Sequence, residues 1–296
     1  MEYALEIKNL EKKYPDFYLN HINLSIPKGS IMGFIGANGA GKSTTMKAVL
    51  QLIESDAGEI YLFGKKVENP KNDWKEEVGV VFDEINFYET LTPKKVGNIL
   101  NQAYKNWDMT KYESYLNQFE LPVAQEIKTF SKGMKVKLSL ATAMSHHAKL
   151  LILDEPTSGL DPIVRDEILD FFLDFVQDEE HSILISSHIT TDLEKIADYI
   201  TFIDKGKMLL SSTKDDLIYN YGIIRCSETD FKSINKEDII AYKKEEYQYN
   251  VLINQKEAMK VKYPHFVMDA ATIEEIMLLY VKGEVIHEST DFERFI

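Results

Sequence analysis

The alternation of hydrophobic and polar residues divides the start of the chain into short strands. Residues 4–8 and 18–26 alternate apolar and polar positions, which predicts antiparallel strands, and Pro27–Gly29 turns the chain after them. The apolar run Ile31–Ile35 ends in glycines, and a helical pattern follows from Lys42 to Ile53. A strand, a glycine-rich loop and a helix in this order open an α/β domain.

The alternation of strands and helices continues further along the chain. A mostly helical stretch runs from about Thr92 to His147, with Pro93 and Pro122 as breaks. The run Leu150–Leu153 is too apolar for an edge strand, which predicts a strand buried in a parallel sheet. The pattern then predicts a helix over 162–178, a strand over Ser182–Ser186, a helix over 190–197 and a strand over Tyr199–Ile203.

The character of the sequence changes after residue 221. Residues 222–270 contain short strand-like runs, namely Gly222–Cys226 and Tyr247–Ile253. Residues 271–282 have the spacing of an amphipathic helix, with an apolar face formed by Ile273, Ile276, Met277 and Tyr280. We expect this part to be a separate small α+β domain over 222–296, after a first domain over 1–221.

The composition argues against a nucleic-acid partner and is consistent with a reducing compartment. A total of 34 basic and 48 acidic residues gives a formal net charge of −14, whereas a nucleic-acid backbone requires surplus Lys and Arg. Cys226 is the only cysteine, which excludes an intrachain disulfide and suits a reducing cytosol. The sequence contains no run of 18 apolar residues, and its start has the pattern of a strand rather than of a signal peptide. Any role at a membrane is therefore expected to come through a partner protein.

The segment Gly36-Ala-Asn38-Gly39-Ala-Gly41-Lys42-Ser43 fits the phosphate-binding pattern GxxxxGK[ST]. Glycines allow backbone N–H groups to point at phosphate oxygens, and the positive end of the following helix faces the same way. Lys42 would reach the β- and γ-phosphates, and the hydroxyl of Ser43 would bind Mg²⁺. Because the motif lies between a strand and a helix, it predicts a nucleotide site, to which we also assign Thr44.

Two adjacent carboxylates follow the buried strand. In Leu150-Leu-Ile-Leu-Asp154-Glu155 they end the strand, which places them at the carboxyl edge of the sheet beside the glycine-rich loop. Asp154 could hold Mg²⁺ through water, and Glu155 could act as general base on the attacking water. His188 follows the next strand directly and could contact the γ-phosphate. The other histidines are treated as structural: His21, His146, His147, His181, His265 and His287.

The ordered motifs GANGAGKST, FSKGM, LLILDEPTSGLD and SSH resemble those of ATP-binding-cassette (ABC) ATPases, over residues 2 to about 220. The resemblance implies a P-loop NTPase core sheet with an antiparallel β subdomain and a helical subdomain at about 88–148. It also implies that Glu155 is the catalytic base, His188 the switch histidine and Ser158–Asp161 the D-loop. Tyr14 matches the aromatic residue that stacks on adenine, although a lone Tyr here could equally be a core or surface residue.

The signature motif, usually LSGGQ in this family, is here Phe130-Ser131-Lys132-Gly133-Met134. Ser131 and Gly133 are retained and suffice to direct a hydroxyl and a helix N-terminus at the γ-phosphate of another subunit. The family uses this segment in trans, which implies a second nucleotide-binding subunit, in a homodimer or a heterodimer. Lys132 and Met134 depart from the usual pattern.

Asp83 stands where the family usually has glutamine. A carboxylate oxygen also suits a hard cation, so we hypothesise that Asp83 keeps a role toward Mg²⁺ and couples the site to the segment Asn86–Lys95, which would touch a membrane partner. The alternative is a solvated loop acid beside Glu84. The C-terminal helix resembles that of exporter-type cassettes whose permease is a separate chain, although its apolar stripe would more commonly be intradomain core.

These features favour the ATP-hydrolysing subunit of a transporter, with ATP and Mg²⁺ as cofactors and membrane-spanning permease subunits as partners. The expected location is the cytoplasmic face of the cell membrane, and export is favoured over import. A soluble ABC ATPase of translation or DNA maintenance is the alternative, but the chain has one set of motifs and no heptad run. A P-loop kinase or GTPase would not explain FSKGM or His188.

Overall fold

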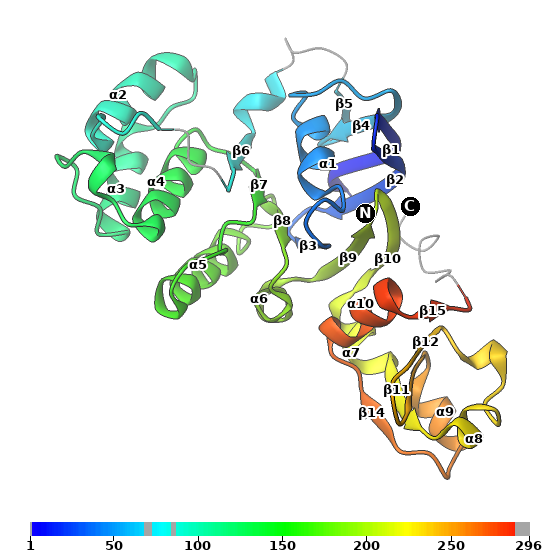
Figure 1. Ribbon diagram of the computed structural model, residues 1–296. Coiled ribbons are helices and arrows are strands. Elements are labelled where there is room, and N and C mark those ends of the chain that lie inside the picture. The colour runs from blue at the N-terminus through cyan, green and yellow to red at the C-terminus, as the bar shows by residue number, and fades with distance from the viewer. Residues whose placement is uncertain (1, 68–72, 84–86, 288–296) are drawn as a thin grey trace.

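The computed structural model describes residues 2–67, 73–83 and 87–287, and three β-sheets form within these ranges (Figure 1). The expectations that concern Glu84 and Asn86 lie outside the described residues. Along the described ranges, no helix combines the length and the apolar character that crossing a membrane requires.

The first sheet is antiparallel, as the alternation of residues 4–8 and 18–26 predicts. Its strand order is β2-β1-β4-β5. The strands are β1 (Tyr3–Tyr14), β2 (Phe17–Pro27), β4 (Ala57–Leu62) and β5 (Lys65–Lys66). Apolar side chains of β1 and β2 lie in one core with those of helix α1 (Lys42–Val49) and of the central strands described next.

The second sheet forms the centre of the molecule and has the order β10-β9-β3-β8-β7-β6. Its parallel strands are β3 (Ile31–Ile35), β6 (Val78–Val81), β7 (Leu150–Asp154), β8 (Ser182–Ser187) and β9 (Tyr199–Asp204). Every residue of β3, β7 and β8 is buried, as continuous apolar runs predict for a sheet covered on both faces. This arrangement confirms the predicted α/β core.

Strand β10 (Lys207–Thr213) was not predicted from the sequence. It pairs antiparallel with β9 through a turn at Lys205 and Gly206, whose φ angles are 46° and 75°. Positive φ at both positions is the geometry of a two-residue hairpin turn, and glycine favours it.

The helices beside the central sheet include α5 (Pro162–Phe175), α6 (Thr190–Ile196) and α7 (Lys214–Asn220), with a 3₁₀ turn at Asp73–Glu76. Helix α1 is shorter than its predicted range to Ile53. It ends at Val49 because Gln51 adopts a φ of 53°, which a right-handed helix cannot continue through.

The expected helical stretch forms a group of helices at the β6 edge of the central sheet (Figure 1). It contains α2 (Pro93–Ala103), α3 (Met109–Gln118), a 3₁₀ turn at Ile127–Thr129 and α4 (Lys132–Met144). Pro93 does not break a helix but begins one, because its missing N–H is not needed at the first helical position. Helix α4 packs against strand β6.

The C-terminal part contains the third sheet, of order β14-β11-β13-β12-β15. Its strands are β11 (Gly222–Cys226), β12 (Ala241–Lys244), β13 (Tyr249–Ile253), β14 (Met268–Ala270) and β15 (Glu284–Val285). Its helices are α8 (Glu228–Phe231), α9 (Lys256–Lys262) and α10 (Ile273–Lys282), with a 3₁₀ turn at Lys236–Asp238. The predicted α+β composition is therefore present.

The apolar face of α10 joins the third sheet to the rest of the chain. Ile273 and Ile276 are fully buried, and they belong to one hydrophobic cluster with Leu193 and Ile196 of α6. The backbone N–H of Ile273 also donates to the carboxylate of Glu194, at 3.2 Å. The stripe on this helix is therefore core, as expected, but that core extends across to helix α6.

Candidate active site

The glycine-rich loop joins β3 to α1 in a conformation that glycine makes accessible. A Cβ atom at Gly36 would lie 2.4 Å from the carbonyl oxygen of Ile203, so no larger residue fits there. Gly41 has a φ of 118° and forms the N-cap of α1. The loop therefore lies close against the β9–β10 hairpin, with its backbone turned toward the amino end of α1.

Lys42 is the first residue of α1, and its side chain curls back over the loop. Its ammonium donates to the carbonyl oxygen of Gly36 at 2.6 Å and lies 3.2 Å from Oε1 of Glu155. Only 6% of this residue is exposed. A buried ammonium with these two partners is held at the mouth of the loop, where phosphate oxygens could compete for it.

The loop opens onto a cavity of about 680 Å³, a volume suited to a small-molecule ligand. Of its lining residues, Asp16 lies in the turn before β2, Phe17 begins that strand, and Asp83 follows β6. The remaining lining residues are Ala37, Asn38, Gly39, Ala40, Gly41, Lys42, Ser43, Thr44, Asp154 and Glu155. The structure thus brings the glycine-rich loop and the predicted carboxylates to one cavity, as the rule on carboxyl ends of parallel strands predicts.

A single hydroxyl group, that of Ser186 on β8, contacts both residues of the carboxylate pair, Asp154 at the end of β7 and Glu155 directly after it. It donates to Oδ1 of Asp154 at 2.7 Å and accepts from the backbone N–H of Glu155 at 3.0 Å. Ser186 is fully buried, and Asp154 is 7% exposed. Ser186 was not recognised as a site residue from the sequence, although its position just before Ser187 and His188 was the available signal.

Glu155 is held between two basic side chains. Its Oε2 lies 2.6 Å from Nδ1 of His188, and its Oε1 forms the ion pair with Lys42. The backbone φ of Glu155 is 52°, a left-handed conformation that is uncommon for a residue with a side chain and clusters at functional sites. A carboxylate fixed from both sides beside the cavity can accept a proton from water without first being reoriented.

Tyr14 lies beside the cavity rather than in its lining. Its ring is half-exposed and its centroid is 6.4 Å from that of Phe17, which does line the cavity. A Cβ atom at Gly41 would lie 3.1 Å from Phe17, so this ring reaches the glycine-rich loop. Phe17 is therefore a second aromatic candidate, and the sequence pattern, whose predicted strand begins one residue later, did not distinguish it.

The signature residues do not line this cavity. Ser131 is the N-cap of α4, and its hydroxyl accepts from the backbone N–H of Met134 at 3.2 Å. Gly133 is buried, with Val164 of α5 only 2.8 Å from where a Cβ atom would stand. Lys132 alone reaches back toward the cavity, where its ammonium lies 3.6 Å from Oδ1 of Asp83.

Oxygen atoms dominate the candidate metal ligands. Within the described ranges, no group of three or more His, Cys, Asp or Glu side chains is arranged to hold a metal ion. Ser43, Asp83 and Asp154 nevertheless line one cavity and offer a hydroxyl and carboxylates. Mg²⁺ prefers such oxygen ligands and usually completes its shell with phosphates and water, so this donor set fits Mg²⁺ with a bound nucleotide.

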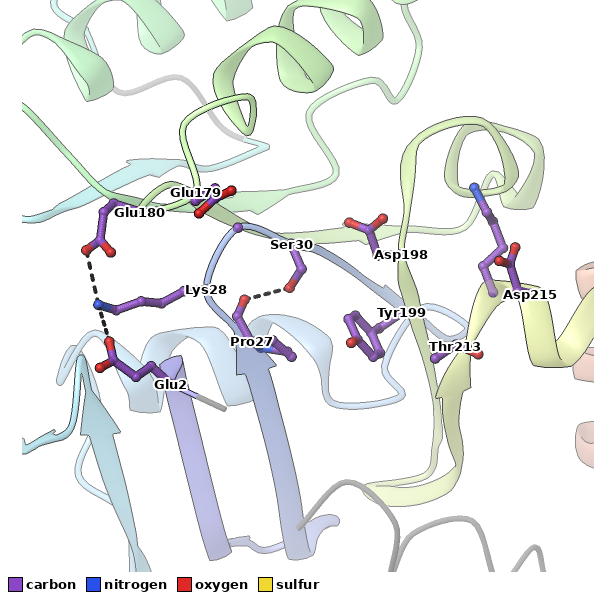
Figure 2. A pocket seen from close by; sticks show the side chains of 12 residues that line it. Glu2, Pro27, Lys28, Ser30, Glu179, Glu180, Asp198, Tyr199, Thr213 and Asp215 are labelled. Atoms are coloured by element: carbon purple, nitrogen blue, oxygen red, sulfur yellow. Dashed lines mark hydrogen bonds and ion pairs between the residues drawn. The ribbon is translucent and has the colours of Figure 1, made fainter.

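Another cavity, of about 860 Å³, lies at the opposite, amino end of strands β3, β8 and β9 (Figure 2). Lys28 there forms ion pairs with Glu2 at 2.7 Å and Glu180 at 3.0 Å. The hydroxyl of Ser30 donates to the carbonyl oxygen of Pro27. These polar groups are satisfied by one another, and none of the predicted site residues lies in this cavity.

Comparison with known proteins agrees with this geometry. The family model described as ABC transporter matches residues 19–158. The bacitracin transport ATP-binding protein BcrA of Enterococcus faecalis is 37% identical over 71% of this chain and 69% of its own length. The ABC transporter ATP-binding protein YtrB of Bacillus subtilis is 29% identical over 88% of this chain and 89% of its own.

A solved structure described as the ATP-binding subunit of an ABC transporter is 28% identical and has a TM-score of 0.64. The match covers 72% of this chain and 91% of that one. The glycine-rich loop and the paired carboxylates line one cavity, and a histidine contacts one of those carboxylates. In agreement with this geometry, the chain belongs to the ABC transporter family as one of its ATP-binding, ATP-hydrolysing subunits.

Proposed function

We propose that this chain powers the export of a drug, peptide or antibiotic-like substrate through a separate membrane permease. The observation that carries the catalytic part of the proposal is the position of Glu155, held between Lys42 and His188 at the edge of the cavity. The similarity to a bacitracin transport protein supports the class of substrate. The chain would act at the cytoplasmic face of the membrane, where ATP is available.

In this proposal, the loop Gly36–Ser43 binds the phosphates of ATP through its backbone N–H groups, and Thr44 lies at the first turn of α1 beside them. Lys42 exchanges its contacts with the Gly36 carbonyl and Glu155 for the β- and γ-phosphates. The adenine ring stacks on Tyr14 or on its neighbour Phe17, whose ring is already in the cavity lining.

Mg²⁺ would be held by Ser43 and Asp154, with Asp83 as a further oxygen ligand. When bound, Mg²⁺ supplies Lewis-acid stabilisation of phosphate charge. Glu155 accepts a proton from the attacking water, and His188 keeps its carboxylate pointed at the cavity through the 2.6 Å contact. In this proposal, His188 contacts both the γ-phosphate and the carboxylate of Glu155.

Because Ser131 and Gly133 lie outside the cavity of their own chain, we infer that they complete the site of a second nucleotide-binding subunit, identical or different. ATP bound between two such subunits would hold them together, and hydrolysis would release them. We further propose that residues 1–221 form the ATPase domain, with a helical subdomain at about 88–148 facing the permease, and that 222–296 form an accessory domain.

The test measures, by size-exclusion chromatography, whether Glu155→Gln forms a dimer when ATP is added. Glutamine keeps the size of the side chain but cannot accept the proton, so ATP should remain bound and the dimer should accumulate. Glu179→Gln, on the rim of the distant cavity, is the matched control and should behave as wild type. A Glu155→Gln chain that binds ATP and stays monomeric would contradict dimerisation of this chain with itself.

A further inference from the structure

Two of the positions at which the chain departs from its family pattern form an ion pair with each other. Asp83 stands where glutamine is usual, and Lys132 lies within the signature motif. The ammonium of Lys132 lies 3.6 Å from Oδ1 of Asp83, although the two residues are far apart in the sequence. Asp83 lines the nucleotide cavity, whereas Lys132 is the first residue of α4. Their contact therefore joins the cavity to the signature helix of the same chain.

The side chain of Lys132 follows a defined course to reach Asp83. Ser131 caps α4 and fixes the direction in which the helix leaves the loop. The lysine then passes the D-loop, because a Cβ atom at Gly159 would lie 3.3 Å from its Nζ and 3.9 Å from its Cδ. Lys132 therefore lies between the loop that carries Asp83 and the loop that carries Gly159.

The charges around the cavity explain why Asp83 attracts this lysine. The cavity lining contains four carboxylates and one ammonium, that of Lys42. Lys42 already lies against Glu155, at 3.2 Å. Of the ion pairs in the described part of the chain, the one made by Asp83 is with Lys132. A divalent cation at the cavity would compete for the same carboxylate, because its charge is twice that of the ammonium.

We propose that Lys132 is a positioning residue that pairs with Asp83 in the nucleotide-free chain and leaves it when Mg²⁺ and nucleotide are bound. Asp83 then turns to the metal, and the freed Lys132 and signature helix can face a second cassette. This exchange makes metal loading of one site a condition for presenting the signature motif to the other. The inference rests on the proposed function, because it uses the roles given there to Asp83 and to α4.

The first experiment measures how much Mg²⁺ improves binding of a fluorescent ATP analogue, as the ratio of affinities in MgCl₂ and in EDTA. It is done at a concentration where light scattering shows a monomer. Lys132→Met should raise this ratio about two- to five-fold, the range expected for a half-exposed ion pair. Lys132→Arg should leave it near wild type, and in an Asp83→Asn background Lys132→Met should have no effect.

Lys135→Met is the matched control. Lys135 lies one turn further along α4 and forms an ion pair of the same length, 3.6 Å, with Glu89, away from the cavity. Its substitution should leave the Mg²⁺ ratio unchanged. The proposal is overturned if Lys132→Met changes the ratio no more than Lys135→Met, or changes it equally with and without Asp83.

A second readout needs neither metal nor nucleotide. The rate of acetylation of Lys132, followed by mass spectrometry, should rise about two- to five-fold in Asp83→Asn, because the carboxylate would no longer hold the amino group away from the reagent. Lys137, paired with Glu167, is the internal reference. An unchanged rate would overturn the pair itself. Failure of the proposed function would show elsewhere, as a Glu155→Gln chain that does not dimerise with ATP.

Discussion

Ser186→Ala is the most informative single substitution, because one hydroxyl holds both the carboxylate of Asp154 and the backbone of Glu155. The change removes one oxygen atom from a fully buried side chain and leaves the packing of β8 otherwise intact. It deletes the hydrogen bond to Asp154 at 2.7 Å and the acceptor for the backbone N–H of Glu155 at 3.0 Å. The Glu155 backbone is already in a left-handed conformation, so it depends on such support.

The magnitude follows from the two hydrogen bonds. A bond to a charged carboxylate contributes about 1.5–3 kcal/mol to stability, and a neutral one about 1 kcal/mol. The free energy of unfolding of Ser186→Ala should therefore fall by about 2.5–4 kcal/mol. A displacement of catalytic groups by about 1 Å can reduce turnover about 100-fold, so we expect kcat to fall by about 10- to 100-fold. Nucleotide affinity should change little, because Ser186 does not line the cavity.

Three measurements test this prediction: thermal unfolding without nucleotide, binding of a fluorescent ATP analogue, and phosphate release at saturating ATP. The matched control is Ser182→Ala, at the other end of the same strand. Ser182 is also fully buried, and its hydroxyl accepts from the backbone N–H of Gly29 at 3.1 Å. Its loss should cost about 1 kcal/mol and leave turnover unchanged.

The reasoning is refuted if Ser186→Ala hydrolyses ATP as fast as Ser182→Ala while both chains are folded. That result would mean that the strand and the ion pair of Glu155 with Lys42 position the carboxylates without the hydroxyl. A loss of nucleotide affinity as large as the loss of turnover would also contradict it, because the damage would then extend to the glycine-rich loop.

Two further predictions follow from packing. In Gly36→Ala, the new methyl group would lie 2.4 Å from the Ile203 carbonyl oxygen, so the loop must move. The affinity for a fluorescent ATP analogue should then fall at least about ten-fold. An unchanged affinity would contradict this prediction. Burial lowers the pKa of His146, against opposing hydrogen bonds to the backbone of Val78 and Thr142. As pH falls, His146 therefore binds a proton in the unfolded chain before it does in the folded chain. The free energy of unfolding should fall below about pH 6.5, by at most about 1.4 kcal/mol per pH unit. Urea unfolding measures this dependence, and His146→Gln should abolish it.

Much of the site could be predicted because its chemistry depends on local sequence. The loop Gly36–Ser43 and the pair Asp154 and Glu155 each lie directly after a buried apolar strand. Carboxyl ends of parallel strands meet at one edge of a sheet, so the strand pattern alone implied that these residues share a cavity. His188 was placed at the same edge by the same reasoning, and it contacts Glu155.

The missed residues have no local signature. Phe17 is an ordinary strand residue until the chain folds so that its ring reaches the glycine-rich loop. Ser186 is one polar residue in a buried strand, and its partners belong to the neighbouring strand β7. The hairpin that contains strand β10 was missed although Lys205 and Gly206 form its turn, because the turn residues alone do not reveal which strand follows.

The sequence by itself determined the family, the alternation of strands and helices around the glycine-rich loop and the paired carboxylates, and the residues that can carry phosphate and carboxylate chemistry, because these depend on residue type and short spacings. The tertiary structure alone decided which distant residues meet. Asp83 and Lys132 form an ion pair only because β6 and α4 pack together, and Ile273 joins the core of α6 only because the third sheet lies beside it. Contacts between residues far apart in the chain are set by packing of whole elements, which no short pattern records.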